Sequence, residues 1–245
     1  MVTAGMNKLE PKSPMLLQFP DAADMFRSLA DDIVARLTEG VSSRGSASFV
    51  ASGGTTPGDL YDALAQRDPP WDRVSVTLSD ERWVPPTSDA SNEKLIRTRL
   101  MQGNASGARF VPMKTAQPHP RDAEAAVSAA LSAMPRPFDV TLLGMGDDGH
   151  TASMFPGSDG LERALDTQSP MLARGIRPAD VAKTGERMSL TLRAILDSRL
   201  VIVLLRGAAK LETYRTALAG DDVHAMPVRA VLRRSLTPVQ VYWSP

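Results

Sequence analysis

The chain has 245 residues, of which 42% are hydrophobic and 23% charged, the balance of an ordinary globular protein. Its 28 basic and 28 acidic side chains cancel, so nothing indicates the basic surface of a nucleic-acid-binding protein. The absence of cysteine excludes disulfides and thiol chemistry, and no apolar run approaches the roughly 20 residues that a membrane helix needs. A cytoplasmic protein without a membrane or nucleic-acid partner fits this composition.

The first 15 residues differ from the rest of the chain. They lack the apolar centre of a signal peptide, so we expect residues 1–15 to form a flexible leader. Residues 16–245 show no repeat, no low-complexity linker and no shift in composition. Their length suits one large α/β domain, and we expect a single domain over 16–245.

Hydrophobic periodicity divides this domain into alternating strands and helices. The first predicted helix begins near Asp21, carries apolar residues at helical spacing and ends at Gly40. Residues 156–186 are rich in proline, glycine and charge, which indicates loops and short pieces, and residues 188–196 mix strand and helix patterns. In chain order we expect a strand over 15–19, a helix over 21–40, a strand over 46–51, a helix over 57–67, a strand over 74–79, a helix over 91–101, a strand over 108–113, a helix over 121–134, a strand over 138–144, a strand over 200–206, a helix over 208–220, a helix over 228–234 and a strand over 239–243.

Strands that alternate with helices and are apolar throughout predict a parallel sheet covered on both faces. In such sheets, ligands bind beyond the carboxyl ends of the strands. Polar and glycine-rich residues gather at four of these ends. They are "SGGTTP" (52–57), "SDERWVPP" (79–86), "GMGDDGHTAS" (144–153) and "RGAAK" (206–210).

Two of these stretches have the composition of an anion site. In "SGGTTP", two glycines let the backbone approach a ligand, Ser52, Thr55 and Thr56 offer hydroxyls, and Pro57 opens a helix whose free N–H groups favour an anion. It is not a Walker loop, because no Gly-Lys-Ser/Thr follows, and a simple capped turn is an equal reading. In "RGAAK", Lys210 lies one helical turn after the strand and could reach a phosphate, or be an ordinary solvated lysine.

The stretch "SDERWVPP" places Asp80, Glu81 and Arg82 beyond a buried strand. Three consecutive charges usually belong to a solvated loop. Here Trp83 and two prolines follow, which indicates a fixed conformation. Arg82 is suited to bind an anion or a carbonyl, because its guanidinium is planar and always charged.

The stretch "GMGDDGH" matches the Gly-x-Gly-x-x-Gly pattern of dinucleotide-binding loops. Its chemistry argues against that use. Asp147 and Asp148 would face a pyrophosphate, and one like-charge contact at about 4 Å costs on the order of 4 kcal/mol at an effective dielectric of 20. The long helix that should follow is also interrupted by Pro156 and Gly157. A dehydrogenase is therefore disfavoured.

The glycines have another use, because they allow a tight loop to hold His150 at the edge of the sheet. Neutral imidazole is suited to general-base catalysis near pH 7. An isolated histidine would be read as an ordinary surface or core residue, but this one stands beside two aspartates and a strand end. Asp148, Asp147 or Asp80 could orient the ring, and the sequence leaves this choice open.

Taken in order, the four stretches resemble the 6-phosphogluconolactonases and, more distantly, the glucosamine-6-phosphate deaminases and isomerases. The likeness runs from about residue 16 to the end. It is carried by "ASGGTTPGDLYDAL", "SDERWVPPTSDASNEKLIR", "FDVTLLGMGDDGHTASMFPGS" and "LVIVLLRGAAK". The residues "HTASMFPG" point to the lactonase, because the deaminase stretch usually reads "HIAFNEP".

The resemblance implies a three-layer α/β/α sandwich around a largely parallel sheet, similar to the glucosamine-6-phosphate deaminase and ribose-5-phosphate isomerase folds. It implies one catalytic domain that hydrolyses 6-phosphoglucono-1,5-lactone in the pentose phosphate pathway, with no metal and no cofactor. Family members often have Thr-Gly where this chain has Arg206-Gly207, so the role of Arg206 is open. By residue, the resemblance implies His150 as general base, Ser52, Gly53, Gly54, Thr55 and Lys210 around the phosphate, and Asp80, Glu81 and Arg82 as the charged motif of the family. To these we add our own expectations: Asp148 as a catalytic partner of His150 together with Asp80 and Arg82, Arg206 as a further phosphate contact, and Glu81, Gly146 and Arg187 as candidate substrate contacts.

Two other functions remain open at this stage. An amino-sugar phosphate deaminase or isomerase would share the fold and use Asp80 as its base. A non-catalytic sugar-phosphate binding domain would need the phosphate loops but no histidine. We expect the only partner to be a small sugar-phosphate lactone, and the protein to be a monomer or a weak homodimer.

Overall fold

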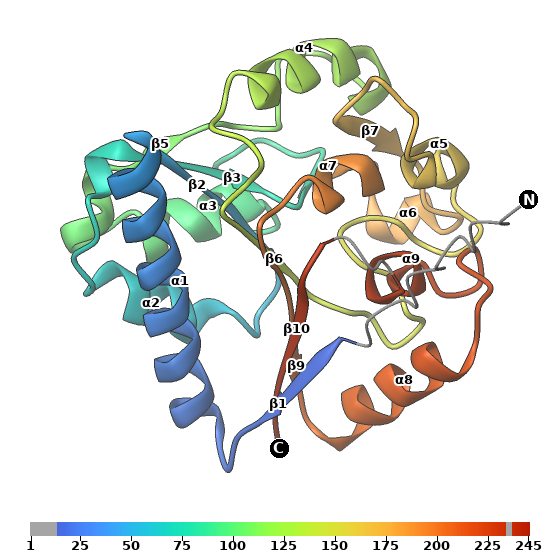
Figure 1. The fold of residues 1–245 in the computed structure, drawn as a ribbon. Helices are drawn as coiled ribbons and strands as arrows, with labels where there is room; N and C mark the ends of the chain where they lie inside the picture. Colours follow the sequence, from blue (N-terminus) through green and yellow to red (C-terminus); the bar gives the residue numbers. More distant parts are fainter. Residues whose placement is uncertain (1–13, 234–236) are drawn as a thin grey trace, which may run out of the picture.

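The computed structural model of the protein describes residues 14–233 and 237–245. Its centre is a seven-stranded sheet in which every neighbouring pair of strands is parallel (Figure 1). The predicted parallel sheet is thus confirmed. In spatial order the strands are β1 (Met15–Gln18), β10 (Val239–Ser244), β9 (Val201–Arg206), β6 (Val140–Leu143), β2 (Ala47–Ala51), β3 (Val74–Leu78) and β5 (Arg109–Phe110).

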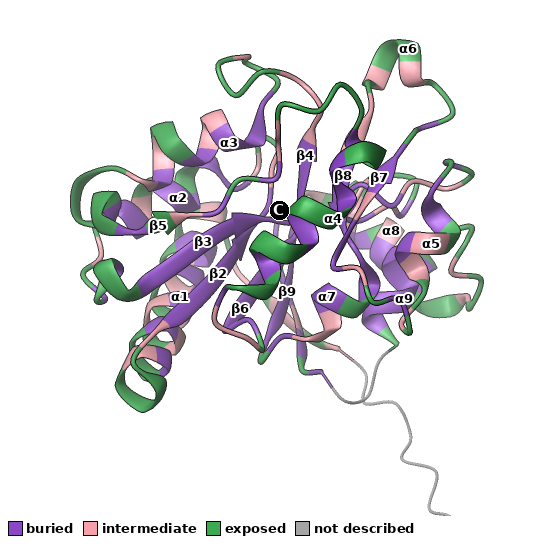
Figure 2. Cartoon of the chain, turned by 90° about the horizontal axis from the view of Figure 1, so that it is seen from above, coloured by how far each residue is buried: buried purple, intermediate pink, exposed green. Residues whose placement is uncertain are grey.

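Helices lie on both sides of this sheet, which makes the predicted three-layer sandwich (Figure 1). Every residue of β2, β3 and β6 is buried, as expected of strands covered on both faces (Figure 2). On one side lie α1 (Ala22–Arg44) and α2 (Gly58–Ala65), and on the other lie α7 (Leu192–Leu196), α8 (Ala208–Ala219) and α9 (Val228–Leu232).

The first helix begins as predicted but ends later than predicted. The side chain of Asp21 accepts a hydrogen bond from the N–H of Asp24 at 2.8 Å and caps the helix. The predicted end at Gly40 is wrong, because Gly40 is a close-packing position: a Cβ there would lie 2.8 Å from Oδ1 of Asp139. The helix continues to Arg44, and Gly45 ends it with a φ of 79°.

Two other predicted elements are shorter or less regular than their sequence pattern indicated. The helix predicted over 91–101 is an α-helical turn, α3 (Asn92–Leu95), that continues as a π-helical segment over Ile96–Leu100. The strand predicted over 108–113 pairs only at Arg109–Phe110. The Ala-rich helix is α4 (Pro120–Ser132), with Pro120 at its start.

A second, antiparallel sheet was not predicted. It contains β4 (Asp80–Arg82), β8 (Arg187–Leu190) and β7 (Ala173–Ile176), in that order. The charged run after β3 is therefore a strand, which agrees with the expected fixed conformation and rules out the alternative of a solvated loop. The register pairs Arg82 with Arg187, which brings together two regions more than a hundred residues apart in the sequence.

The segments with ambiguous patterns form short elements. The region expected to hold short pieces contains α5 (Leu161–Leu165), β7 and α6 (Val181–Thr184). The mixed segment 188–196 divides into β8 and α7, so both of its patterns were real. Most of the predicted leader and the end of the helix predicted over 228–234 lie outside the described residues, although Met15 already belongs to β1. Within the described part of the chain, every helix is too short or too polar to cross a membrane.

Candidate active site

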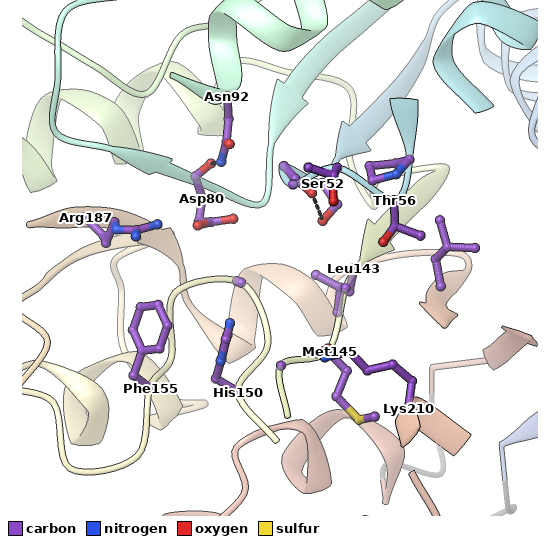
Figure 3. Close-up of a pocket in the computed structure, with 18 of the residues that line it drawn as sticks. Ser52, Thr56, Asp80, Asn92, Leu143, Met145, His150, Phe155, Arg187 and Lys210 are labelled. Atoms are coloured by element: carbon purple, nitrogen blue, oxygen red, sulfur yellow. Dashed lines mark hydrogen bonds between the residues drawn. The ribbon is translucent and has the colours of Figure 1, made fainter. Parts of the chain in front are cut away.

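The largest concentration of the predicted site residues lines one cavity of about 350 Å³ at the carboxyl ends of the parallel strands (Figure 3). It lies where β6 and β2 are neighbours. From that point the sheet continues through β3 on one side and β9 on the other, which is the switch point where α/β sheets bind ligands. The predicted residues that line it are Ser52, Gly53, Gly54, Thr55, Asp80, Arg82, Gly146, His150, Arg187, Arg206 and Lys210.

His150 and Asp148 form a hydrogen-bonded pair at the edge of this cavity. Nδ1 of the imidazole lies 2.6 Å from Oδ1 of Asp148, and the N–H of His150 donates to the same oxygen at 3.0 Å. Burial alone would raise the pKa of Asp148, but the hydrogen bonds and charge of His150 outweigh it and hold that pKa below its ordinary value. An ionised Asp148 only accepts, so Nδ1 carries the hydrogen and Nε2 is the basic nitrogen.

The loop that holds this pair depends on Gly146 and Gly149. The N–H of Gly146 donates to the carbonyl of His150 at 2.9 Å, and the N–H of Gly149 donates to the carbonyl of Gly146 at 3.1 Å. A Cβ on Gly146 would lie 2.1 Å from Nδ1 of His150 and 2.6 Å from Oδ1 of Asp148. Gly149 has a φ of 76°, which favours glycine. The Gly-x-Gly-x-x-Gly pattern therefore forms a tight loop that holds His150.

Of the three aspartates that the sequence left open, only Asp148 contacts the imidazole. Asp147 pairs instead with Nζ of Lys210 at 2.7 Å. Asp80 lies across the cavity from His150 (Figure 3) and accepts hydrogen bonds from Oγ of Ser79 at 3.0 Å and Oγ of Ser153 at 2.5 Å. The geometry therefore selects Asp148 as the partner of His150.

Phe155 is a site residue that sequence reasoning missed. Its ring centroid lies 4.4 Å from that of His150, and Cζ of Arg187 lies 5.6 Å from the same ring. Phe155 thus contacts both the imidazole and a guanidinium. The turn that delivers it includes Ala152, whose φ of 49° is unusual for a residue with a Cβ. The only signal in the sequence was the stretch "TASMFPG", which carries the resemblance but names no site residue.

Asn92 is the second missed residue, since it was assigned no functional role from the sequence. It lines the cavity, and its Oδ1 accepts from Nη1 of Arg82 at 2.7 Å. Its Nδ2 donates to the carbonyl of Asp80 at 2.8 Å. The amide therefore fixes both ends of the short strand β4.

Glu81 does not line the cavity, although the resemblance made it a candidate substrate contact. It is fully buried, and its carboxylate accepts four hydrogen bonds, from the N–H groups of Arg82, Asn92 and Glu93 and from the hydroxyl of Ser91. Burial raises the pKa of Glu81, and these four bonds partly offset that rise. Its carboxylate joins β4 to the beginning of α3.

The charges of the cavity wall favour an anionic ligand. Four cationic side chains line it against a single carboxylate, that of Asp80. Burial lowers the pKa of Arg187 from its ordinary value, although the charge of Asp80 works the other way. Lys210 approaches from the third position of α8, and its Nζ donates to the carbonyl of Met145 at 2.7 Å. No group of three metal-ligating side chains occurs among residues 14–233 and 237–245.

The family model described as glucosamine-6-phosphate isomerases/6-phosphogluconolactonase matches residues 20–243, nearly the whole of the chain. The chain belongs to this family. It is 40% identical to the 6-phosphogluconolactonase of Rhizobium meliloti (strain 1021), over 93% of this chain and 97% of that protein. It is 42% identical to that of Mesorhizobium japonicum, over 93% of this chain and 94% of that protein. The predicted resemblance is confirmed.

Solved structures agree with this assignment. A 6-phosphogluconolactonase from Shewanella baltica OS155 superposes with a TM-score of 0.92 at 43% identity, covering 96% of this chain and all of that chain. A monomeric glucosamine-6-phosphate deaminase superposes with a TM-score of 0.76 at 16% identity, over 94% of this chain and 97% of that chain. The second likeness shows the fold alone. The predicted fold class is confirmed.

Proposed function

We propose that this chain hydrolyses 6-phospho-D-glucono-1,5-lactone to 6-phospho-D-gluconate, a step of the oxidative pentose phosphate pathway. The observation that carries the proposal is one cavity that combines an imidazole–carboxylate pair with four cationic side chains. Such a wall suits a phosphorylated substrate, and such a pair suits the activation of water. Water adds to the ester carbonyl, the ring C–O bond breaks, and a carboxylic acid and an alcohol result.

The phosphate binds at the loop after β2, between Gly53–Gly54 and Lys210. Gly54 has a φ of 91°, which lets the loop present its backbone to the cavity, and Ser52 and Thr55 add hydroxyls beside it. Arg206 lines the same part of the wall. The phosphate is remote from the reacting carbon, so its binding supplies orientation, worth up to roughly 7–11 kcal/mol in favourable cases.

The ester reacts beside His150. Nε2 of the imidazole takes a proton from water as the oxygen attacks the lactone carbonyl, while Asp148 holds the ring through Nδ1. Arg82 and backbone N–H groups stabilise the charge that develops on the carbonyl oxygen. His150 then returns the proton to the ring oxygen as the ester opens. The sequence contains no Gly-x-Ser-x-Gly, which is consistent with direct attack by water instead of a covalent acyl-enzyme.

The protein works as a cytoplasmic monomer or weak homodimer in this proposal. The large hydrophobic side chains that are exposed in the described part of the chain are Met15 and Leu218. Two such residues do not form a broad apolar surface, which supports the absence of an obligate interface.

The test compares glucono-1,5-lactone with and without its 6-phosphate, each measured over spontaneous hydrolysis. Lys210→Ala should lower kcat/KM for the phosphorylated lactone by about 10-fold to 100-fold, the range for a hydrogen bond to a charged group. Its effect on the unphosphorylated lactone should be small. Lys183→Ala is the control, because it removes an exposed lysine outside the cavity. Equal losses on both lactones would contradict the phosphate role, and ammonia release from glucosamine 6-phosphate would favour the deaminase.

A further inference from the structure

The side chain of Asn92 lies at the junction between the phosphate loop and the strand that carries Arg82. It is 2% exposed and belongs to the wall of the cavity, on the same side as Asp80 (Figure 3). Both of its polar atoms have protein partners: Oδ1 accepts from Arg82 and Nδ2 donates to the carbonyl of Asp80. The amide of Asn92 therefore binds protein groups, and we expect the neighbouring side chains to contact the ligand.

The same amide packs directly on the phosphate loop. A Cβ on Gly53 would lie 2.1 Å from Oδ1 of Asn92 and 2.3 Å from its Cγ and Nδ2. The φ of Gly53 is not in the left-handed region, so this glycine is needed for space and not for an unusual backbone. Asn92 thus contacts the loop at one face and holds the guanidinium of Arg82 through its oxygen.

The backbone of Asn92 is fixed in turn by Glu81. That buried carboxylate accepts the N–H of Asn92 at 2.8 Å and the N–H of Glu93 at 2.7 Å. It also accepts a hydrogen bond from the N–H of Arg82 at 2.7 Å. The side chain of Glu81 therefore fixes the backbone of both Asn92 and Arg82. Arg82 gains a further anchor, because its Nη1 donates to the carbonyl of Ala90 at 2.9 Å.

We propose that Asn92 is a positioning residue that sets the separation between the Gly53 loop and the guanidinium of Arg82. This inference rests on the proposed function, in which the loop binds the phosphate and Arg82 faces the ester carbonyl. Oδ1 of Asn92 contacts both the Gly53 loop and Nη1 of Arg82, so the amide fixes the guanidinium at the edge of the phosphate loop. Because the contact between Arg82 and the carbonyl oxygen strengthens as charge develops, its misplacement lowers kcat more than it raises KM.

A double-mutant cycle between Asn92 and Arg82 tests this role, with kcat and KM for 6-phosphogluconolactone measured over the spontaneous rate. Asn92→Ala lowers kcat/KM by about 10-fold to 100-fold in the wild-type background, the range for one hydrogen bond to a charged group. In the Arg82→Ala background the same substitution costs less than about twofold, because its target is gone. The same loss in both backgrounds overturns the proposal.

The variant Asn92→Asp distinguishes the contact with Arg82 from the packing of residue 92 against the Gly53 loop. The carboxylate keeps an acceptor for Arg82 but loses the donor to the carbonyl of Asp80, so kcat falls less than in Asn92→Ala. Its charge lies against the phosphate loop, so KM rises. A kcat as low as that of Asn92→Ala overturns the proposal. If Asn92→Ala does not fold, the cycle uses Asn92→Ser, which is too short to reach Arg82.

Two controls keep the outcomes distinct. Asn104→Ala removes an exposed amide outside the cavity and leaves activity unchanged, and thermal unfolding is recorded for every variant. Absence of lactonase activity in the wild type contradicts the proposed function itself. Full activity of Arg82→Ala removes Arg82 from the mechanism and overturns the role of Asn92 with it. Additive losses at Asn92 and Arg82 overturn the positioning role alone.

Discussion

The two walls of the cavity are built in different ways. In the loop after β6, Asp148 and His150 are two residues apart and the hydrogen bonds of the loop close within a few residues. The wall formed by β4 and α3 depends on contacts between distant residues: Asn92 is 12 residues from Asp80, and Ser153 is 73 residues from it. A local loop can be recognised from the sequence, whereas a wall assembled over long distances cannot.

This difference predicts that the loop controls rate while the wall controls both rate and stability. Gly146→Ala should have the largest effect, since its Cβ would occupy the space of the imidazole and of Asp148. We expect a loss of kcat of about 10²-fold or more, as for removal of a general base, with little change in the thermal midpoint. Gly144→Ala is the matched control, because a Cβ there would lie 3.7 Å from its nearest neighbour, Oγ of Ser52, and the cost should be far smaller. Similar losses in the two variants would argue against a special role for Gly146.

Glu81→Gln should destabilise the wall formed by β4 and α3. The amide would turn an N–H group toward backbone donors that now share a buried carboxylate. We expect the free energy of unfolding to fall by about 2–4 kcal/mol, measured by urea denaturation. Glu39→Gln, at an exposed position of α1, should change it by less than about 0.5 kcal/mol. Unchanged stability in Glu81→Gln would mean that the four bonds do not hold the wall.

The smallest effect should be a pH-dependent one at Asp148. Its pKa is lower in the folded protein than the ordinary value of 3.8, so the folded state binds this proton less tightly than the unfolded state. The stability that ionised Asp148 contributes is therefore complete above that value and is lost as the pH falls through the folded pKa. The difference in unfolding free energy between the wild type and Asp148→Asn should shrink as the pH falls from 6 to 3. A difference that grows instead would contradict the pairing.

The same contrast explains what the sequence could predict. Alternating apolar strands and helices were sufficient for the parallel sheet, and strand ends were sufficient to collect the cavity residues, because both are patterns of neighbouring residues. The antiparallel sheet was missed, since β4 has three residues and its partner β8 begins at Arg187. Gly40 was read as a helix stop because its packing against Asp139 cannot be seen in a local pattern.

The individual side chains of the site show the same difference between local patterns and long-range contacts. The pair formed by His150 and Asp148 was among the alternatives, and only the structure could choose between three aspartates. Glu81 was interpreted as a candidate substrate contact, and Asn92 was assigned no functional role. Their roles in the wall depend on atoms delivered by other segments, including the close approach of Gly53.

The most direct test of the account is acid release from freshly prepared 6-phosphogluconolactone, measured above the spontaneous rate for the wild type and for His150→Asn. The account predicts rapid hydrolysis by the wild type and a loss of about 10²–10⁴-fold in kcat for the variant, with unchanged folding. Near wild-type turnover by His150→Asn would contradict the assignment of His150 as the base, and no hydrolysis by the folded wild type would contradict the proposed function.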